Sequence, residues 1–325
     1  INGFGRIGRV LTRSLINNKN NIEIVAINDL VDTKMLCHLL KYDTVHRNLG
    51  HSINFSESSI SINNQRIQVF NKKNPEDLPW SELDIDIVIE STGFFRSKKN
   101  AAKHLSAGAK KVIISAPSTD SDVKTIVMGI NDDTLTPDDT IVSNASCTTN
   151  CAAPMVKLVN DICVINEGFL TTTHAYTGDQ NIHDAPHKDL RRSRAAAQNI
   201  IPTTTGAAKA IGRIFPDLEG KIEGIGIRVP VIDGSMTDLI CRVDNPVSTD
   251  VIRDAFKNLS NNELNGVLAY TEDPIVSVDI IGNPNSCIID GLLTTIVGNL
   301  VRVVGWYDNE VGYSNRLIDL VHKMG

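Results

Sequence analysis

The segment GFGRIG at residues 3–8 most constrains the fold of this chain. It fits the pattern G-x-G-x-x-G and leads into a helical stretch at residues 9–16, followed by an apolar strand at 22–27. Asp29 follows 21 residues after Gly8, at the place where an acid can bind the hydroxyls of an adenosine ribose. A tight strand-to-helix turn with a surface Asp is the alternative interpretation. Together the two features favour a dinucleotide site, in which a helix N-terminus binds a pyrophosphate.

Short apolar runs alternate with helical stretches over residues 1–146. The runs at 22–27, 85–89, 112–114 and 126–127 are typical of buried strands. Between them, residues 97–109 begin with a Ser that can cap a helix and end near Gly108. This alternation predicts an α/β Rossmann-type domain with a parallel sheet. Because the glycine motif starts at residue 3, we expect most of the strand before it to lie upstream of Ile1.

The pattern changes at Cys147. A helix-like stretch at 152–163 is followed by longer strand-like segments at 169–174, 222–231, 235–243 and 300–307. We therefore expect residues 147–309 to form an α+β domain with a mostly antiparallel sheet. Residues 310–325 place apolar side chains on one helical face, so this last helix is expected to join the first domain.

Composition excludes several classes of protein. The 32 Lys and Arg residues against 38 Asp and Glu give a formal net charge of −6, which argues against a long polyanion such as nucleic acid as a required partner. The sequence contains no apolar run of the roughly 20 residues that a membrane span needs. For lack of such a span, we expect a cytoplasmic location. The six cysteines are too sparse for a domain held by disulfides, so we expect reduced thiols, and without a C-x-x-C pair we expect no metal site.

Cys147 is the candidate nucleophile. It lies in the small polar segment SNASCTTNC (143–151), between a strand-like and a helix-like run. A helix N-terminus stabilises a thiolate, so we expect the pKa of Cys147 to be lowered. His174, at the end of an apolar strand, is the candidate base. Spacing alone leaves open that both residues are structural, and Cys151 is interpreted either as packing or as a secondary redox partner.

Basic and hydroxyl side chains near this pair suit an anionic substrate. They are Lys188, Arg191, Arg192 and Arg194 in one segment, the tract TTTG at 203–206, and Arg228. Guanidinium groups and threonine hydroxyls together bind phosphate well. A solvated charged loop is the alternative for any one of these residues.

With these three centres identified, the sequence resembles the phosphorylating glyceraldehyde-3-phosphate dehydrogenases. The resemblance is carried by INGFGRIGR (1–9), SNASCTTNC (143–151), THAYTGDQ (173–180), HKDLRRSRAAA (187–197), TTTGAAKA (203–210), IRVP (227–230) and WYDNEVGYSNR (306–316), and it extends over essentially the whole chain.

The resemblance implies a role for individual residues. Cys147 would be the nucleophile and His174 its base. One phosphate pocket would use Thr177 and Arg228. A second would use Ser146, Thr148, Thr205, Gly206 and one arginine of the pair Arg191 and Arg192, with Arg192 the first choice. The cofactor NAD would be bound by Gly3, Gly5, Arg6, Ile7, Gly8, Asp29, Lys73, Ser115 and Asn309.

The resemblance also implies an activity. Glyceraldehyde 3-phosphate would be oxidised to 1,3-bisphosphoglycerate with inorganic phosphate and NAD, through a thiohemiacetal and a thioester on Cys147, by a homotetramer. Ala185 stands where NAD-specific members often have Leu, and a smaller residue there resembles forms that also accept NADP. Asp29 argues the other way, because a carboxylate repels a 2′-phosphate, so we expect NAD preference with some use of NADP. Erythrose-4-phosphate dehydrogenase and a non-catalytic binding role are the alternatives.

Overall fold

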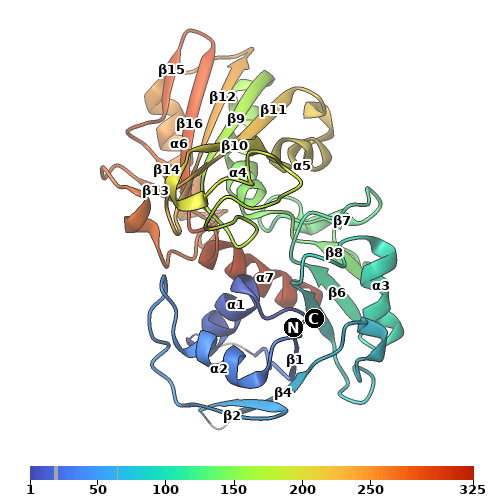
Figure 1. Cartoon of the computed structure of the whole chain (residues 1–325). Helices are drawn as coiled ribbons and strands as arrows, with labels where there is room; N and C mark the ends of the chain where they lie inside the picture. Colours follow the sequence, from blue (N-terminus) through green and yellow to red (C-terminus); the bar gives the residue numbers. More distant parts are fainter. Residues whose placement is uncertain (18–20, 64) are drawn as a thin grey trace. The chain divides into compact units, whose positions relative to one another are not determined.

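The chain divides into two compact units. The computed structural model describes residues 1–17, 21–63 and 65–325 (Figure 1). The first unit comprises Ile1–Ile126, Thr134–Ala145 and Ser314–Gly325, and the second comprises Val127–Asp133 and Ser146–Tyr313. The domain boundaries expected from the sequence, residues 1–146 with 310–325 and residues 147–309, stay a prediction.

The sheet of the first unit has two halves. One half has the order β1(Ala26–Asn28), β4(Gln65–Phe70), β3(Ser59–Ile62) and β2(Ile53–Ser56), and the other has β5(Ile87–Glu90), β6(Lys111–Ile114), β8(Ile141–Ser143) and β7(Lys124–Thr125). The second half is parallel throughout, as predicted. The first half is parallel only between β1 and β4. Asn2 forms a parallel bridge to Asn28 and another to Glu90, so this residue links the two halves.

Helices of the first unit begin at capping side chains where the sequence offers them. The unit contains α1(Arg6–Asn17), α2(Thr33–Lys41), α3(Lys98–Ser106) and most of α7(Val311–Met324). The Ser97 side chain accepts from Asn100 N and begins α3 where the sequence predicted. The strand predicted at 126–127 is wrong, because the ladder there comprises Lys124 and Thr125. The strand predicted at 22–27 begins only at Ala26.

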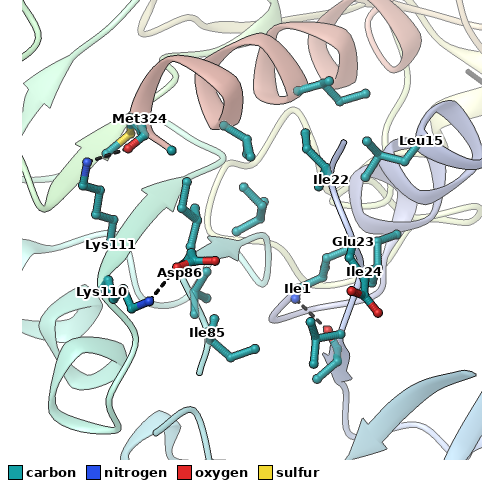
Figure 2. Close-up of a pocket in the computed structure, with 18 of the residues that line it drawn as sticks. Ile1, Leu15, Ile22, Glu23, Ile24, Ile85, Asp86, Lys110, Lys111 and Met324 are labelled. Carbon is teal, nitrogen blue, oxygen red and sulfur yellow. Dashed lines mark hydrogen bonds and ion pairs between the residues drawn. The ribbon is translucent and has the colours of Figure 1, made fainter. Parts of the chain in front are cut away.

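A cavity of about 810 Å³ lies between the two half-sheets of the first unit. Its apolar lining comes from the strand edges around residues 22–26 and 85–89, from Leu11 and Leu15 of α1, and from α7 (Figure 2). Ion-paired Lys110 and Asp86 lie at its rim, 2.8 Å apart. Among the described residues, Asn2 bridges both half-sheets next to this cavity.

The second unit contains one mixed sheet that is mostly antiparallel, as predicted. Its order is β10(Ile201–Thr204), β11(Ile222–Val229), β9(Ile165–Ala175), β12(Ser235–Val243), β16(Leu300–Tyr307), β14(Cys287–Asp290) and β13(Leu268–Thr271), with β15(Thr295–Val297) paired to β16. The limits predicted for β12 and β16 are confirmed. The pairs β9 with β11 and β13 with β14 are parallel.

Three helices pack on one face of this sheet. They are α4(Cys147–Cys163), α5(Ala207–Ile214) and α6(Thr249–Asn261), with α4 against β12, β14 and β16.

Short 3-10 helices occur in both units, at Pro75–Asp77, Asp132–Thr134, Ala196–Gln198, Pro216–Leu218 and Ser277–Ile280. Within the described ranges of the chain, every helix is too short or too polar to cross a membrane.

Candidate active site

Cys147 is the first residue of α4. The helix begins five residues earlier than the predicted 152–163, because the Ser146 side chain accepts a hydrogen bond from Thr149 N at 3.1 Å and caps it. Cys147 is partly exposed, whereas Cys151, one turn further on, is buried with its sulfur 3.7 Å from Gly305 O. Burial favours packing over a redox role for Cys151.

His174 lies beside the Cys147 thiol. Its Nε2 is 3.4 Å from the Cys147 sulfur, and its Nδ1 is 2.7 Å from the carbonyl oxygen of Ala175. Arg228 is the cross-strand partner of His174 in the parallel pair of β9 and β11. Its Nη1 lies 2.7 Å from His174 Nδ1 and donates to Ala175 O at 2.8 Å. The structure thus brings the predicted nucleophile, base and phosphate-binding arginine together.

Burial determines the resting charge of this pair. It raises the pKa of Cys147 to about 11, although the Arg228 cation and hydrogen bonds from Thr148 act to lower it. Burial, and then Arg228, lower the pKa of His174 to about 3. The prediction of a lowered thiol pKa is therefore wrong for this state: desolvation of the thiolate exceeds the stabilisation by the helix N-terminus. Both groups rest in their neutral forms.

Tyr307 packs against the pair and was missed by the sequence analysis. Its ring meets that of His174 edge to face, with centroids 5.9 Å apart. Its hydroxyl is 2.8 Å from the hydroxyls of Thr148 and Thr172, and burial raises its pKa. The Thr148 hydroxyl, predicted to bind phosphate, lies in this buried network. The signal for Tyr307 was its place in the string WYDNEVGYSNR.

The remaining predicted anion ligands belong to the same unit. Arg192 donates from Nε to Thr203 Oγ1 at 2.8 Å and pairs with Asp179 at 2.5 Å, and its charge acts on the pKa of His174. Arg191 is exposed. Thr205 and Gly206 precede α5, where the Thr205 hydroxyl accepts from Ala207 N at 3.3 Å. Of the arginine pair, Arg192 is therefore the one that lies near His174.

Two further residues of the predicted anion sites make local bonds within their own loop. Thr177 is half-buried, and its carbonyl accepts from Gln180 N. In the basic segment, Arg194 is ion-paired with Asp184 at 2.9 Å. Arg194 is therefore engaged in holding its own loop.

The glycine motif of the first unit has the geometry that a dinucleotide needs. Gly3 has φ +91°, and a Cβ on it would lie 2.7 Å from Thr92 N. A Cβ on Gly8 would overlap the carbonyl oxygen of Gly3, whereas Gly5 faces open space at the start of α1. Asp29 accepts hydrogen bonds from Phe4 N at 2.7 Å and from Val31 N at 3.0 Å. The turn, the helix N-terminus and the acid together fit NAD.

The other predicted cofactor residues lie in both units. Arg6 is ion-paired with Asp43, and although burial of Asp43 raises its pKa, hydrogen bonds from Arg6 and the backbone lower it to about 2. Ile7 is half-buried in α1, and Lys73 is exposed after β4. Ser115 follows β6 and donates from its backbone N to Glu90 O at 2.9 Å. Asn309 belongs to the second unit, where its Oδ1 accepts from Ser235 Oγ at 2.6 Å.

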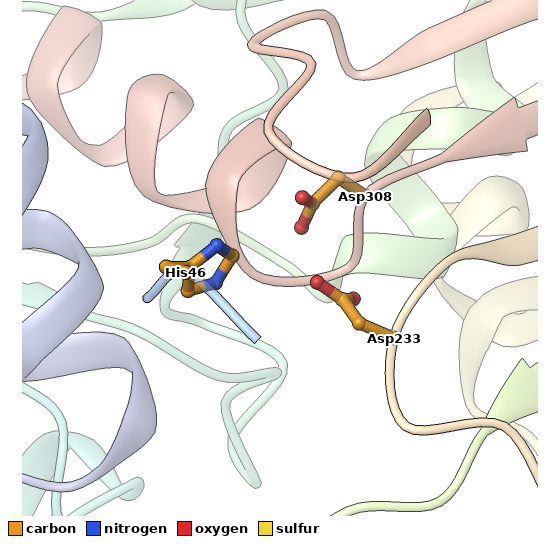
Figure 3. Close-up of side chains that lie close together, drawn as sticks. All are labelled: His46, Asp233 and Asp308. Atoms are coloured by element: carbon orange, nitrogen blue, oxygen red, sulfur yellow. The ribbon is translucent and has the colours of Figure 1, made fainter. Parts of the chain in front are cut away.

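A buried carboxyl pair in the second unit was also missed. Asp233 and Asp308 lie close together (Figure 3). Asp308 accepts backbone hydrogen bonds from Gly282, Glu310 and Val311 at 2.7–2.8 Å. Burial, the charges of Asp308 and Glu310, and a hydrogen bond to Asp308 raise the pKa of Asp233 to about 8. Asp233 is therefore largely protonated at neutral pH.

Comparison with known proteins agrees with this geometry. The family model described as the glyceraldehyde 3-phosphate dehydrogenase C-terminal domain matches residues 146–309, and that of the NAD binding domain matches residues 1–98. Glyceraldehyde-3-phosphate dehydrogenase 2 of Streptomyces avermitilis is 54% identical over 327 residues, covering 100% of this chain and 97% of that protein. Glyceraldehyde-3-phosphate dehydrogenase 1 of Bacillus subtilis is 49% identical over 322 residues, covering 98% and 96%. The chain thus belongs to the glyceraldehyde-3-phosphate dehydrogenase family and is an NAD-dependent enzyme.

Proposed function

We propose that this enzyme converts glyceraldehyde 3-phosphate and inorganic phosphate to 1,3-bisphosphoglycerate, with Cys147 as its nucleophile. The observation that carries the proposal is the position of the Cys147 thiol at the start of α4, 3.4 Å from His174 Nε2, in a residue of intermediate burial. A thiol suits this reaction because its acyl ester reacts with phosphate far faster than an oxygen ester does. The other five thiols of the chain are buried.

His174 acts as the base during attack. Because thiol and imidazole both rest in neutral forms, the proton moves from Cys147 Sγ to His174 Nε2 as sulfur adds to the aldehyde carbon. The imidazolium that forms can donate from Nδ1 to Ala175 O, which lies 2.7 Å away and fixes the ring. The backbone N–H of Cys147 at the helix start stabilises the oxyanion of the thiohemiacetal.

Two groups of residues receive the anionic oxygens. Arg228 and Thr177 bind one phosphate, and Ser146, Thr148, Thr205, Gly206 and Arg192 bind the other. Arg192 supports this assignment through its electrostatic effect on both His174 and Arg228. The position of Arg228 beside His174 also means that an anion bound there offsets a cation that otherwise opposes formation of the imidazolium.

The first unit holds the cofactor on the glycine motif, with Arg6 and Ile7 at the pyrophosphate, Asp29 at the adenosine ribose, and Lys73 and Ser115 near the adenine and nicotinamide ends. Asn309 would bind the carboxamide. When bound, NAD supplies the acceptor for the hydride of the thiohemiacetal carbon. The Asp29 carboxylate disfavours a 2′-phosphate, so we expect a kcat/KM that favours NAD over NADP, with some NADP use because of Ala185.

A homotetramer in the cytoplasm is part of the proposal. Phe169 and Ile240 are direct cross-strand neighbours on the sheet face of the second unit, and they are 69% and 43% exposed. Ile225, on the next strand, is 49% exposed. Apolar exposure of this kind is typical of a surface that a second subunit covers. Light scattering measures the assembly, and a monomer would contradict it.

The decisive experiment is NAD reduction with glyceraldehyde 3-phosphate, with and without inorganic phosphate. We expect turnover that falls sharply when phosphate is omitted, and loss of turnover in Cys147→Ser with an unchanged unfolding midpoint. Sustained turnover without phosphate would indicate thioester hydrolysis instead. Equal or better turnover of erythrose 4-phosphate would favour the four-carbon alternative. Full activity of Cys147→Ser would refute the assigned nucleophile.

A further inference from the structure

A continuous series of buried hydrogen bonds crosses the first unit. Trp80 Nε1 donates to His104 Nδ1 at 3.0 Å, and His104 Nε2 lies 3.0 Å from Glu90 Oε2. Asn2 Nδ2 donates to the same carboxylate oxygen at 2.5 Å, and Asn28 Nδ2 donates to Asn2 Oδ1 at 2.7 Å. All five side chains belong to residues that are at most 5% exposed. None of them has a role in the proposed chemistry.

The direction of every bond in this series is fixed. An indole N–H can only donate, so His104 Nδ1 must accept and the ring carries its proton on Nε2. His104 therefore donates to Glu90. Because Asn2 also donates to Glu90, its amide oxygen is the atom left to accept from Asn28. A change at Glu90 consequently removes the acceptor that both His104 and Asn2 use, whereas Asn28 stays bonded to the backbone of Lys72 through both atoms of its amide.

Glu90 is the acceptor on which the series depends. Its second oxygen, Oε1, accepts from the backbone N–H of Thr92 at 2.8 Å and from the Thr92 hydroxyl. Four donors thus converge on the two oxygens of one buried carboxyl group, so both oxygens are hydrogen-bonded. At the other end of the series, Asn28 Oδ1 accepts from Lys72 N at 2.8 Å.

The series joins backbone segments next to the proposed cofactor residues. Asn2 precedes Gly3, Asn28 precedes Asp29, and Lys72 precedes Lys73. Glu90 ends β5, and its carbonyl oxygen accepts from Ser115 N at 2.9 Å. Asn28 belongs to one half-sheet and Glu90 to the other, and the backbone of Asn2 bridges both. The hydrogen bonds therefore lie where the two half-sheets meet.

We propose that Glu90 is a positioning residue for NAD: its carboxylate holds the two half-sheets in register, so that the AMP and nicotinamide portions meet one preformed site. The inference rests on the proposed placement of NAD on these loops. AMP contacts one half-sheet, through Asp29 and Lys73, and does not require the register between the halves. NAD extends over both half-sheets, so its binding requires the correct register between them.

The test compares binding of NAD and AMP to the full chain by isothermal titration calorimetry. Glu90→Gln places an amide NH₂ among groups that all donate, and it should raise the Kd for NAD at least about tenfold, a loss of about 1.4 kcal/mol, while the Kd for AMP changes less than about twofold. Equal weakening of both ligands, or no weakening of NAD, would overturn the proposal.

A second pair of variants keeps the test valid if Glu90→Gln does not fold. His104→Gln retains a donor at the position of Nε2 and should bind NAD nearly normally, whereas His104→Leu removes that donor and should weaken NAD selectively. If the two variants bind NAD alike, the proposal fails. Asp29→Asn tests the cofactor placement separately, because it should weaken NAD and AMP together. Unchanged binding by Asp29→Asn would refute that placement. The role of Glu90 is decided separately, by the Kd values of Glu90→Gln for NAD and AMP.

Discussion

Replacing Asp233 by Asn should stabilise the protein, and increasingly so as the pH rises. Asp233 is fully buried, and the side chain of Asp308 beside it accepts hydrogen bonds from three backbone N–H groups. The pKa of Asp233 is raised from 3.8 to about 8 in the folded protein. Its contribution to stability is therefore complete below the unfolded pKa and is lost as the pH rises through the folded pKa. An amide at this position supplies the donor that the protonated acid offers to Asp308, and it stays uncharged at every pH.

The magnitude follows from the size of the pKa shift. Each pH unit between the two pKa values corresponds to about 1.4 kcal/mol, so the wild type should lose on the order of 4 kcal/mol relative to Asp233→Asn between about pH 5 and pH 8. Relaxation of the surrounding groups can only reduce this figure. Urea unfolding followed by circular dichroism at several pH values measures the difference. Asp254→Asn, at an exposed position of α6, is the matched control for the substitution itself. A constant difference for Asp233→Asn would refute the reasoning.

Two further predictions concern the site and its packing. Arg228→Met should raise the pKa of Cys147, because the Arg228 cation lowers it. The pH profile of Cys147 alkylation by iodoacetate should therefore move to higher pH, and an unchanged profile would contradict this. Arg242→Met, on the exposed surface, is the control. Gly305→Ala should destabilise by about 1–3 kcal/mol, because its Cβ would lie 2.5 Å from a buried sulfur. Gly178→Ala, whose Cβ meets nothing within 4 Å, should cost less in the same urea titration, and equal costs would show that the crowding at residue 305 relaxes.

Local patterns sufficed to predict those elements whose signals are local. The cap at Ser97, the glycine motif and the long strands Ser235–Val243 and Leu300–Tyr307 all appear where the sequence placed them. The antiparallel strands β2 to β4 went unpredicted, because they are short and β2 is largely exposed, so the pattern of apolar residues there is weak. The start of α4 was also missed as a helical segment, since residues 147–151 are small and polar.

The candidate site shows a second limit of sequence reasoning. Cys147 and His174 could be paired by residue type and by position near element ends. The oxygen that orients His174 belongs to the backbone of Ala175, and no side-chain pattern reveals it. The resting charge of Cys147 depends on how much water the folded chain excludes, which a helix N-terminus cannot indicate by itself. Glu90 and His104 are 14 residues apart in the sequence, and only the folded structure shows that their side chains meet.

The buried sulfur atoms give the chain its own reporters of transient opening. Cys37 lies in the first unit, and Cys151, Cys163, Cys241 and Cys287 lie in the second. A thiol shielded in this way reacts with a water-soluble disulfide reagent only during the moments when its surroundings open. Once Cys147 is blocked, the labelling rate of Cys37 reports how often the first unit opens. The labelling rates of the other four cysteines report how often the second unit opens. Mass spectrometry over time would then rank the two units by how often each one opens, with no need to introduce new cysteines.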